Sequence, residues 1–190
     1  MLQFLADKLN AGALLVSQLL LTAVVGTDPY FHEVELELRG DRLHCSARLE
    51  ESFTPDLDVL LQSGDTVTIH FEVDLVDLET GTPLAIADWE HWFIYSILED
   101  EFSVYKSEID KTFHSNNFLT ARQDWVVILD APLARLKWME ADHRYQLRMS
   151  AYMDEISMPG MTDKLNLMSY WNRIRPVHTS EPFMKRQLVQ

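Results

Sequence analysis

The chain of 190 residues contains a single cysteine, Cys45. One cysteine excludes an intramolecular disulfide bond and also a zinc site built from several thiolates. Cys45 falls in the apolar phase of an expected strand, so we expect a buried and chemically inert thiol. The sequence also lacks a nucleophile elbow, a P-loop, a Rossmann fingerprint and an HExxH motif. It therefore predicts no catalytic residue and no cofactor.

Basic residues are scarce: 16 Lys and Arg stand against 30 Asp and Glu, a net charge of −14. Such a surface repels phosphate backbones, which disfavours nucleic acid as a general partner. The bases gather late in the chain, because residues 27–134 carry 23 acids and 6 bases, and residues 135–190 carry 6 acids and 9 bases. Either the basic part packs against the acidic part, or it forms a site for an anionic partner.

An uncharged apolar run lies near the N-terminus and is short for a membrane span. Residues 11–25 form 15 uncharged positions, whereas a transmembrane helix needs about 20. Lys8 before the run, and the small residues Val24 and Gly26 around its end, indicate a signal peptide cleaved before Thr27. Because Asp7 cancels Lys8, an apolar N-terminal helix belonging to the fold remains the alternative for residues 1–26. We expect an exported protein, either periplasmic or membrane-anchored and facing the periplasm, and a retained segment would bring the domain close to the membrane.

Apolar and polar residues alternate through most of the remaining chain, which is the period of half-buried strands. The pattern predicts a hairpin over 32–49 and further strands over 66–78, 89–98, 102–107, 124–129, 143–153 and 164–171. A change of phase near Val76 indicates a bulge. Thr54 before Pro55 predicts a short helix that stops near Gly64, and Asp130 before Pro132 predicts a second helix over 131–139.

This order of elements predicts a mainly β fold. We expect an antiparallel β-sandwich or a strongly curved sheet of seven to eight strands with two short helices. The predicted domain spans residues 27–176, and residues 177–190 are expected to form a loose tail. Residues 89–98 are apolar in both phases, so we expect a central strand covered on both sides. The predicted core includes Ile69, Phe71, Trp92, Ile94, Val127 and Leu147.

Metal ligands are not arranged in a recognisable pattern. His44, His70 and His91 could converge only if their strands pair, and histidines on the polar faces of strands are more often solvated. The acidic triplet at 99–101 lacks the ligand spacing and the glycine of a calcium loop. The methionines after residue 148 would suit copper(I), but methionine is also common core filler. The sequence predicts no metal site.

A binding surface is predicted late in the chain, around the turn at Pro159. Aromatic and arginine side chains are enriched at binding hot spots, and flexible methionines adapt to varied partners. The predicted surface comprises Met158, Met161, Met168, Tyr170, Trp171, Arg173 and Arg175. In the alternative interpretation, Trp171 and the methionines fold back and close one end of the sandwich.

The order of these segments resembles an uncharacterised bacterial envelope family, domain of unknown function 4390, over roughly residues 30–175. The resemblance rests on six segments: Pro55–Gly64, Val67–Leu78, Trp92–Leu98, Phe102–Tyr105, Tyr145–Arg148 and the turn at Met158-Pro159. This chain departs from the family pattern in its more acidic strands and in Met158, where a leucine is expected. The resemblance implies an exported envelope protein and implies no catalytic residues.

The leading hypothesis is a non-enzymatic exported β-domain that binds an envelope protein or another macromolecule of the cell envelope. The aromatic residues between 89 and 105 allow an alternative, in which they line a β-cavity that carries a small apolar ligand. An enzyme ranks third, because no acid, base and nucleophile stand in a recognisable constellation.

Overall fold

The computed structural model describes residues 26–157 and 164–188, which form twelve strands and two α-helices. A small sheet has the strand order β1-β2-β7, with β1 (Tyr30–Arg39), β2 (Arg42–Glu50) and β7 (Val127–Arg135). A large sheet has the order β11-β8-β3-β4-β5-β6, with β12 also beside β8. Its strands are β3 (Val67–Asp77), β4 (Thr82–Ser96), β5 (Glu101–Lys106), β6 (Lys111–Ser115), β8 (Arg144–Met153), β11 (Val177–Thr179) and β12 (Phe183–Met184).

The remaining elements are short. They are α2 (Pro55–Leu61), α3 (Phe118–Trp125), the two-residue strands β9 (Glu155–Ile156) and β10 (Leu165–Asn166), and the 3₁₀ turns η1 (Leu136–Trp138), η2 (Leu167–Trp171) and η3 (Lys185–Gln187). Within the described residues, no helix is long and apolar enough to cross a membrane. The predicted signal peptide or apolar helix lies almost entirely outside the described residues, since only Gly26 belongs to them.

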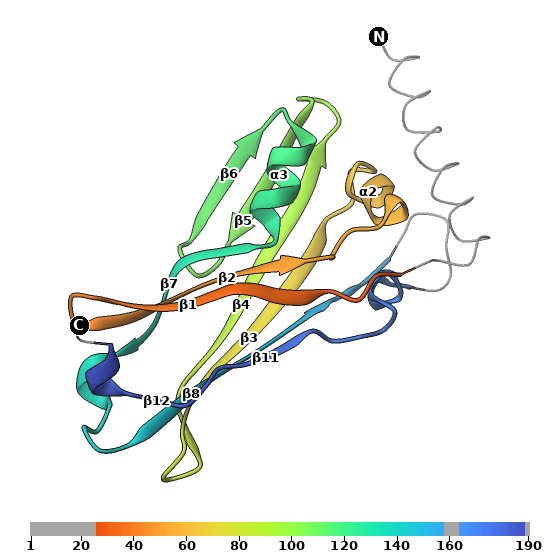
Figure 1. Cartoon of the computed structure of the whole chain (residues 1–190). Coiled ribbons are helices and arrows are strands. Elements are labelled where there is room, and N and C mark those ends of the chain that lie inside the picture. The colour runs from red at the N-terminus through yellow and green to blue at the C-terminus, as the bar shows by residue number, and fades with distance from the viewer. Residues whose placement is uncertain (1–25, 158–163, 189–190) are drawn as a thin grey trace, which may run out of the picture.

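The two sheets face each other across one apolar core, as the predicted mainly β, antiparallel fold requires (Figure 1). β3 carries the clearest pattern, with Ile69, Phe71 and Val73 fully buried between exposed or half-buried neighbours. The expected change of phase is a register shift between Leu75 and Val76. From the small sheet, Cys45 Sγ approaches Met149 Sδ of the large sheet at 4.0 Å. Burial raises the pKa of the Cys45 thiol to about 12, so the thiol is unreactive, as expected.

The first helix forms where the sequence predicts it. The Thr54 hydroxyl accepts a hydrogen bond from the Leu57 amide at 3.0 Å, which caps α2, and Pro55 occupies its first turn. Leu57, Leu60 and Leu61 are buried under the helix. The α2 segment ends before Gly64, which has a positive φ of 96° that other residues rarely adopt.

The second predicted helix, over 131–139, is wrong. Those residues belong to strand β7 and the η1 turn. The second helix of the structure is instead α3, which lies earlier in the chain and is capped by Asn117 through a 3.1 Å hydrogen bond from the Thr120 amide. Pro132 is tolerated in β7 because it sits at a register irregularity on an edge strand, where a missing amide hydrogen costs little. Asp130, the expected cap, instead adopts a φ of 56° on the strand.

The expected core is correct on β3 and β8 and wrong on β4. Ile69, Phe71 and Leu147 are buried, and Val127 is half-buried. Trp92 and Ile94 are 44% and 39% exposed, because the opposite phase of β4, with Trp89, His91 and Phe93, faces the core. β4 is central in its sheet, as predicted, but only one of its faces is covered.

The expected loose tail is wrong for residues 177–188. β11 and β12 both pair with β8, and the Ser180 amide donates to the Leu147 carbonyl at 2.9 Å. The paired segment adds Phe183 and Leu188 to a second apolar cluster around Leu43 and Tyr145. Two further segments differ from the prediction, because 111–115 is strand β6 and 167–171 is a 3₁₀ turn.

Candidate binding surfaces

The structure does not bring the predicted binding residues to one surface. Tyr170 and Trp171 are 2% and 0% exposed, and the Trp171 indole donates to the Ser52 carbonyl at 2.9 Å. Met168 is half-buried, and its sulfur accepts from the Met153 amide at 3.2 Å. Met158 and Met161 lie outside the described residues. The predicted surface is therefore wrong for its two aromatic residues, which close one end of the sandwich.

The start of the domain covers this end. The Thr27 amide donates to the Tyr170 carbonyl at 3.0 Å, and Asn172 donates to Asp28 at 2.6 Å. The backbone at Gly26 approaches so closely that a Cβ there would collide with Asn172. Residues 26–28 thus seal the segment around Trp171 from solvent.

The two arginines of the prediction are exposed, unlike its aromatic residues. Arg173 is exposed at the turn after η2, with a φ of 59°. Arg175 reaches the large sheet, where its guanidinium pairs with Glu72 at 2.7 Å and lies 4.6 Å from the centre of the Tyr152 ring. It therefore belongs to a different surface.

The three histidines considered as metal ligands also lie apart. His44 pairs with Asp130 on the small sheet, and His70 pairs with Asp154 at 2.9 Å on the large sheet. His91 is fully buried, with Nδ1 at 2.7 Å from the Trp125 carbonyl and Nε2 at 3.0 Å from Glu108. Across the described residues, no group of three or more His, Cys, Asp or Glu side chains is placed to hold a metal ion.

One face of the large sheet is not covered by any described helix or strand, and it is here called the outer face. The small sheet and both helices pack on the opposite, inner face, in front of the large sheet in Figure 1. Register places the outer-face side chains in rows across β8, β3, β4 and β5. They are Thr68, His70, Glu72, Asp74, Ile86, Asp88, Glu90, Trp92, Ile94, Ser103, Tyr105, Arg148, Ser150 and Tyr152.

An aromatic pair occupies the middle of this face. Trp92 and Tyr105 are direct cross-strand partners, and their ring centres are 4.6 Å apart. The Trp92 indole donates to Glu90 at 3.1 Å, and the Tyr105 hydroxyl donates to Asp110 at 3.0 Å. The hydrogen bond to Asp110 raises the pKa of Tyr105, with burial adding to the effect. Both rings are thus held in place by carboxylates, with Trp92 44% exposed and Tyr105 half-buried.

Acids surround the aromatic pair toward β3 and β8. Beyond Glu90, the neighbouring rows contribute Glu72, Asp74, Asp88 and Asp154. His70 lies among them, stacked on Tyr152 with ring centres 4.6 Å apart. The outer face therefore combines exposed aromatic surface with a negative field, and its bases Arg148 and Arg175 are few.

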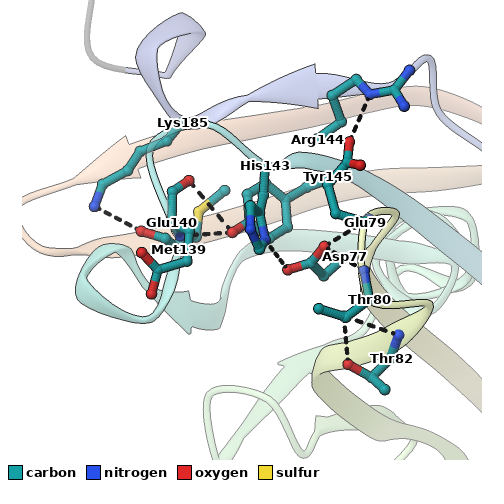
Figure 2. Close-up of polar contacts among 10 residues, drawn as sticks. All are labelled: Asp77, Glu79, Thr80, Thr82, Met139, Glu140, His143, Arg144, Tyr145 and Lys185. Carbon is teal, nitrogen blue, oxygen red and sulfur yellow. Dashed lines mark hydrogen bonds and ion pairs between the residues drawn. The ribbon is translucent and has the colours of Figure 1, made fainter.

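A separate polar cluster around Asp77 and His143 connects the β3–β4 hairpin to the start of β8 (Figure 2). His143 Nδ1 lies 2.6 Å from Asp77 Oδ2, while Asp77 Oδ1 accepts from the amides of Glu79 and Thr80. Figure 2 shows that these groups join the β3–β4 hairpin to the start of β8. Lys185 donates to the Met139 carbonyl at 2.9 Å and ties the C-terminal segment to the same region.

The charges of this cluster are matched. Burial alone would raise the pKa of Asp77, but the hydrogen bonds from His143 and the two amides outweigh it and hold that pKa below its usual value. The hydrogen bond to Asp77 raises the pKa of His143. The Asp77 side chain is 10% exposed and is fully engaged, which indicates a structural fastening.

Comparison with known proteins identifies the family. Residues 29–174 match the model of a family described as a domain of unknown function, DUF4390. The chain belongs to the DUF4390 family. This membership confirms the resemblance, and the match spans both sheets except β11 and β12. Searches of curated proteins and of solved structures found no match. The family description states no activity, so the function of this DUF4390 domain has to be argued from its own residues.

Sequence reasoning missed the outer face because it assigned Trp92 and Ile94 to the core. The sequence did carry a signal: the acids at 88 and 90 alternate in the same phase as Trp92. A phase shared by Asp88, Glu90 and Trp92 is typical of a solvent-facing side, whereas Trp89, His91 and Phe93 share the other phase without an acid.

Proposed function

We propose that the domain is a non-enzymatic binding module of the cell envelope, which holds a cationic and amphipathic segment of another protein against its outer face. The observation that carries this proposal is the aromatic pair of Trp92, which is 44% exposed, and Tyr105, which is half-buried, on a sheet face that no described element covers. Exposed aromatic surface is a feature of interaction sites, and Trp and Tyr are among the residue types that dominate binding energy.

Charge favours a basic partner. Glu72, Asp74, Asp88 and Glu90 lie on adjacent strands of the outer face, and the chain as a whole carries −14. Such a field attracts Lys and Arg and speeds their association. An arginine of the partner can also lie over an aromatic ring, as Arg175 lies over the Tyr152 ring on the same face.

The interior gives less support to the alternative function, a carrier of a small apolar ligand. Phe71, Phe93, Trp125 and Trp171 are all completely buried between the layers. Their rings pack on each other, as between Phe93 and Trp125 at 5.6 Å. Large side chains therefore occupy the space that a ligand in a β-cavity would need.

Export of the domain is part of the proposal and rests on the uncharged run at residues 11–25. Cleavage before Thr27 would leave both sheets and the hydrogen bond from Thr27 to Tyr170 intact. N-terminal sequencing of protein from the native host tests this. A start at Thr27 outside the cytoplasm supports export, and an intact Met1 on a cytosolic protein contradicts it.

Calorimetry with designed peptides tests the binding function. A short peptide that alternates arginine with leucine should bind, and peptides with glutamate for arginine or glycine for leucine should bind much more weakly. The double variant Trp92→Ser with Tyr105→Ser should lose affinity by about tenfold or more. Trp138→Ser is the matched control, because Trp138 is 49% exposed, close to the 44% of Trp92, but lies outside the large sheet. Equal binding by the double variant and the control would contradict the proposal.

A further inference from the structure

A row of arginines crosses one end of the small sheet, at the left of Figure 1. Arg39 of β1 is the cross-strand partner of Arg42 on β2, and Arg42 is the partner of Arg135 on β7. Direct partners in an antiparallel pair point to the same side of a sheet. Their neighbours Leu43 and Ala134 are buried in the core, so the arginines point away from it.

Only the first of these arginines is neutralised within the described residues. Arg39 pairs with Glu37 and Asp130. Arg42 and Arg135 make no ion pair and no side-chain hydrogen bond with any residue in 26–157 or 164–188. Like charges directly opposite each other destabilise a sheet, and here they stand side by side in a chain with nearly twice as many acids as bases. The arrangement calls for an anion that the described part of the chain does not supply.

A pocket opens at the same two arginines. It has a volume of about 330 Å³, is open to solvent, and is lined by Arg42, Pro132, Leu133, Ala134, Arg135 and Trp138. This volume lies at the lower end of the range for small-molecule sites, about 300–1,000 Å³. The pocket therefore joins two guanidinium groups to an apolar wall that includes an exposed indole.

The walls of the pocket are held in place by backbone contacts. The Leu136 amide donates to the Asp41 carbonyl at 2.8 Å, which fixes η1 against the β1–β2 turn. The Met139 amide closes the turn on the Leu136 carbonyl at 3.1 Å. Trp138 is thus presented beside the arginine pair by a fixed turn.

We propose that this pocket binds a phosphate ester whose phosphate group lies between Arg42 and Arg135 and whose organic part packs on Trp138. Guanidinium groups donate pairs of parallel hydrogen bonds to phosphate oxygens, and two of them match the charge of a phosphomonoester. Pro132, Leu133 and the indole complement an apolar or aromatic substituent. Glu37, Asp41 and Asp130 border the arginine row and disfavour a long polyanion such as nucleic acid. The same chemistry occurs in a soluble phosphoester and in a lipid headgroup.

Nuclear magnetic resonance of the indole N–H of Trp138 tests the site, with three probes: inorganic phosphate, phenyl phosphate, and vesicles containing phosphatidic acid. The wild-type signal should shift with phenyl phosphate more strongly than with inorganic phosphate, and phenyl phosphate should raise the melting temperature. A response to vesicles as well as phenyl phosphate assigns the ligand to lipid headgroups, and a response to phenyl phosphate alone assigns it to soluble esters. No shift of Trp138 with any probe overturns the proposal.

Charge-matched variants separate this site from general electrostatic attraction. Arg42→Gln with Arg135→Gln should weaken phenyl phosphate binding by about tenfold or more. Arg48→Gln with Arg173→Gln removes the same charge from exposed arginines outside both proposed sites and should leave binding unchanged. If the first variant does not fold, Arg42→Lys decides, because it keeps the charge but loses the paired hydrogen bonds and should still weaken binding. Equal affinities in the variant and the control overturn the proposal.

Discussion

The two faces of the large sheet are built from the same strands and both carry aromatic side chains, yet only one of them is covered by described elements. β4 gives Trp89, His91 and Phe93 to the inner face and Trp92 and Ile94 to the outer face. The inner face is closed by the small sheet and the two helices, whereas the outer face carries its aromatic residues among acids. Covering by other elements, and not the hydrophobicity of the strand, decides which aromatic residue stabilises the fold. The other aromatic residue is available for binding.

The largest expected effect separates two neighbouring residues of β4. Phe93→Ala should reduce the free energy of unfolding by about 3–5 kcal/mol, because Phe93 is fully buried and packs on the rings of Phe102, Phe118 and Trp125. Trp92→Ala should cost about 1 kcal/mol or less, because its ring is exposed. Denaturant unfolding measures both. Similar losses for the two variants would break the distinction between the faces.

A second comparison concerns two histidines: His91, which is buried on the inner face, and His70, which lies on the outer face. His91→Leu should cost about 2–4 kcal/mol, because it leaves the buried Glu108 carboxyl group and the Trp125 carbonyl without their partner. His70→Gln should cost about 1 kcal/mol or less, because its partner Asp154 is 53% exposed. Chemical denaturation of the two variants in parallel gives the answer. If His91→Leu reduced the free energy of unfolding by less than His70→Gln does, the pair of His91 and Glu108 would not stabilise the packing of the layers.

Asp77 and His143, which join the β3–β4 hairpin to the start of β8, should contribute to the pH dependence of stability. Asp77 has a lowered pKa, so its stabilising contribution is present above the usual value of about 3.9 and is lost as the pH falls through the lowered value. His143 has a raised pKa, so its contribution is present below about 6.5 and is lost as the pH rises through the raised value. The pair therefore stabilises most between about pH 4 and pH 6.5.

Melting curves across this range test the pair, with His143→Gln as the variant and the exposed His32→Gln as the control. Wild type and the control should both lose stability above neutral pH. The decline should be smaller in His143→Gln, because the pair of Asp77 and His143 no longer contributes to it. An unchanged pH profile in His143→Gln would contradict the assignment.

The smallest expected effect concerns a single hydroxyl on the outer face. Tyr105→Phe removes the hydrogen bond to Asp110 but keeps the ring beside Trp92, so the free energy of unfolding should change by about 0.5 kcal/mol or less. Because Asp110 raises the pKa of Tyr105, the phenol of this residue should ionise above the usual value of about 10 in an absorbance titration of wild type against the variant. A loss of several kcal/mol would mean that the outer aromatic pair is structural.

The local part of the fold could be predicted from the sequence. β3 was readable because only one of its phases is apolar, and α2 was readable because Thr54 and Pro55 mark its start. The phase of β4 was misread, because both of its phases carry large apolar side chains and the covering elements come from distant parts of the chain, and only the acids Asp88 and Glu90 mark the phase of Trp92 as solvent-facing. The predicted binding surface was wrong because of contacts between distant parts of the chain: Trp171 donates a hydrogen bond to Ser52, and the segment at Thr27 packs beside it.

The arginine pocket was also beyond the sequence. Arg42 and Arg135 are 93 positions apart and meet only because β2 pairs with β7 in that register. The sequence had indicated a helix over 131–139, which would have placed Arg135 in a different environment. The charge excess after residue 134 was the one signal of an anion site, and it did not locate the residues.

The central claim, that the outer face binds a cationic segment, is tested most directly through the indole N–H signals of the five tryptophans. On addition of the arginine–leucine peptide, the signal of Trp92 should shift, and those of the buried Trp125 and Trp171 and of Trp138 should stay in place. An unmoved Trp92 signal at saturating peptide, or an equal shift with the glutamate peptide, would contradict the account.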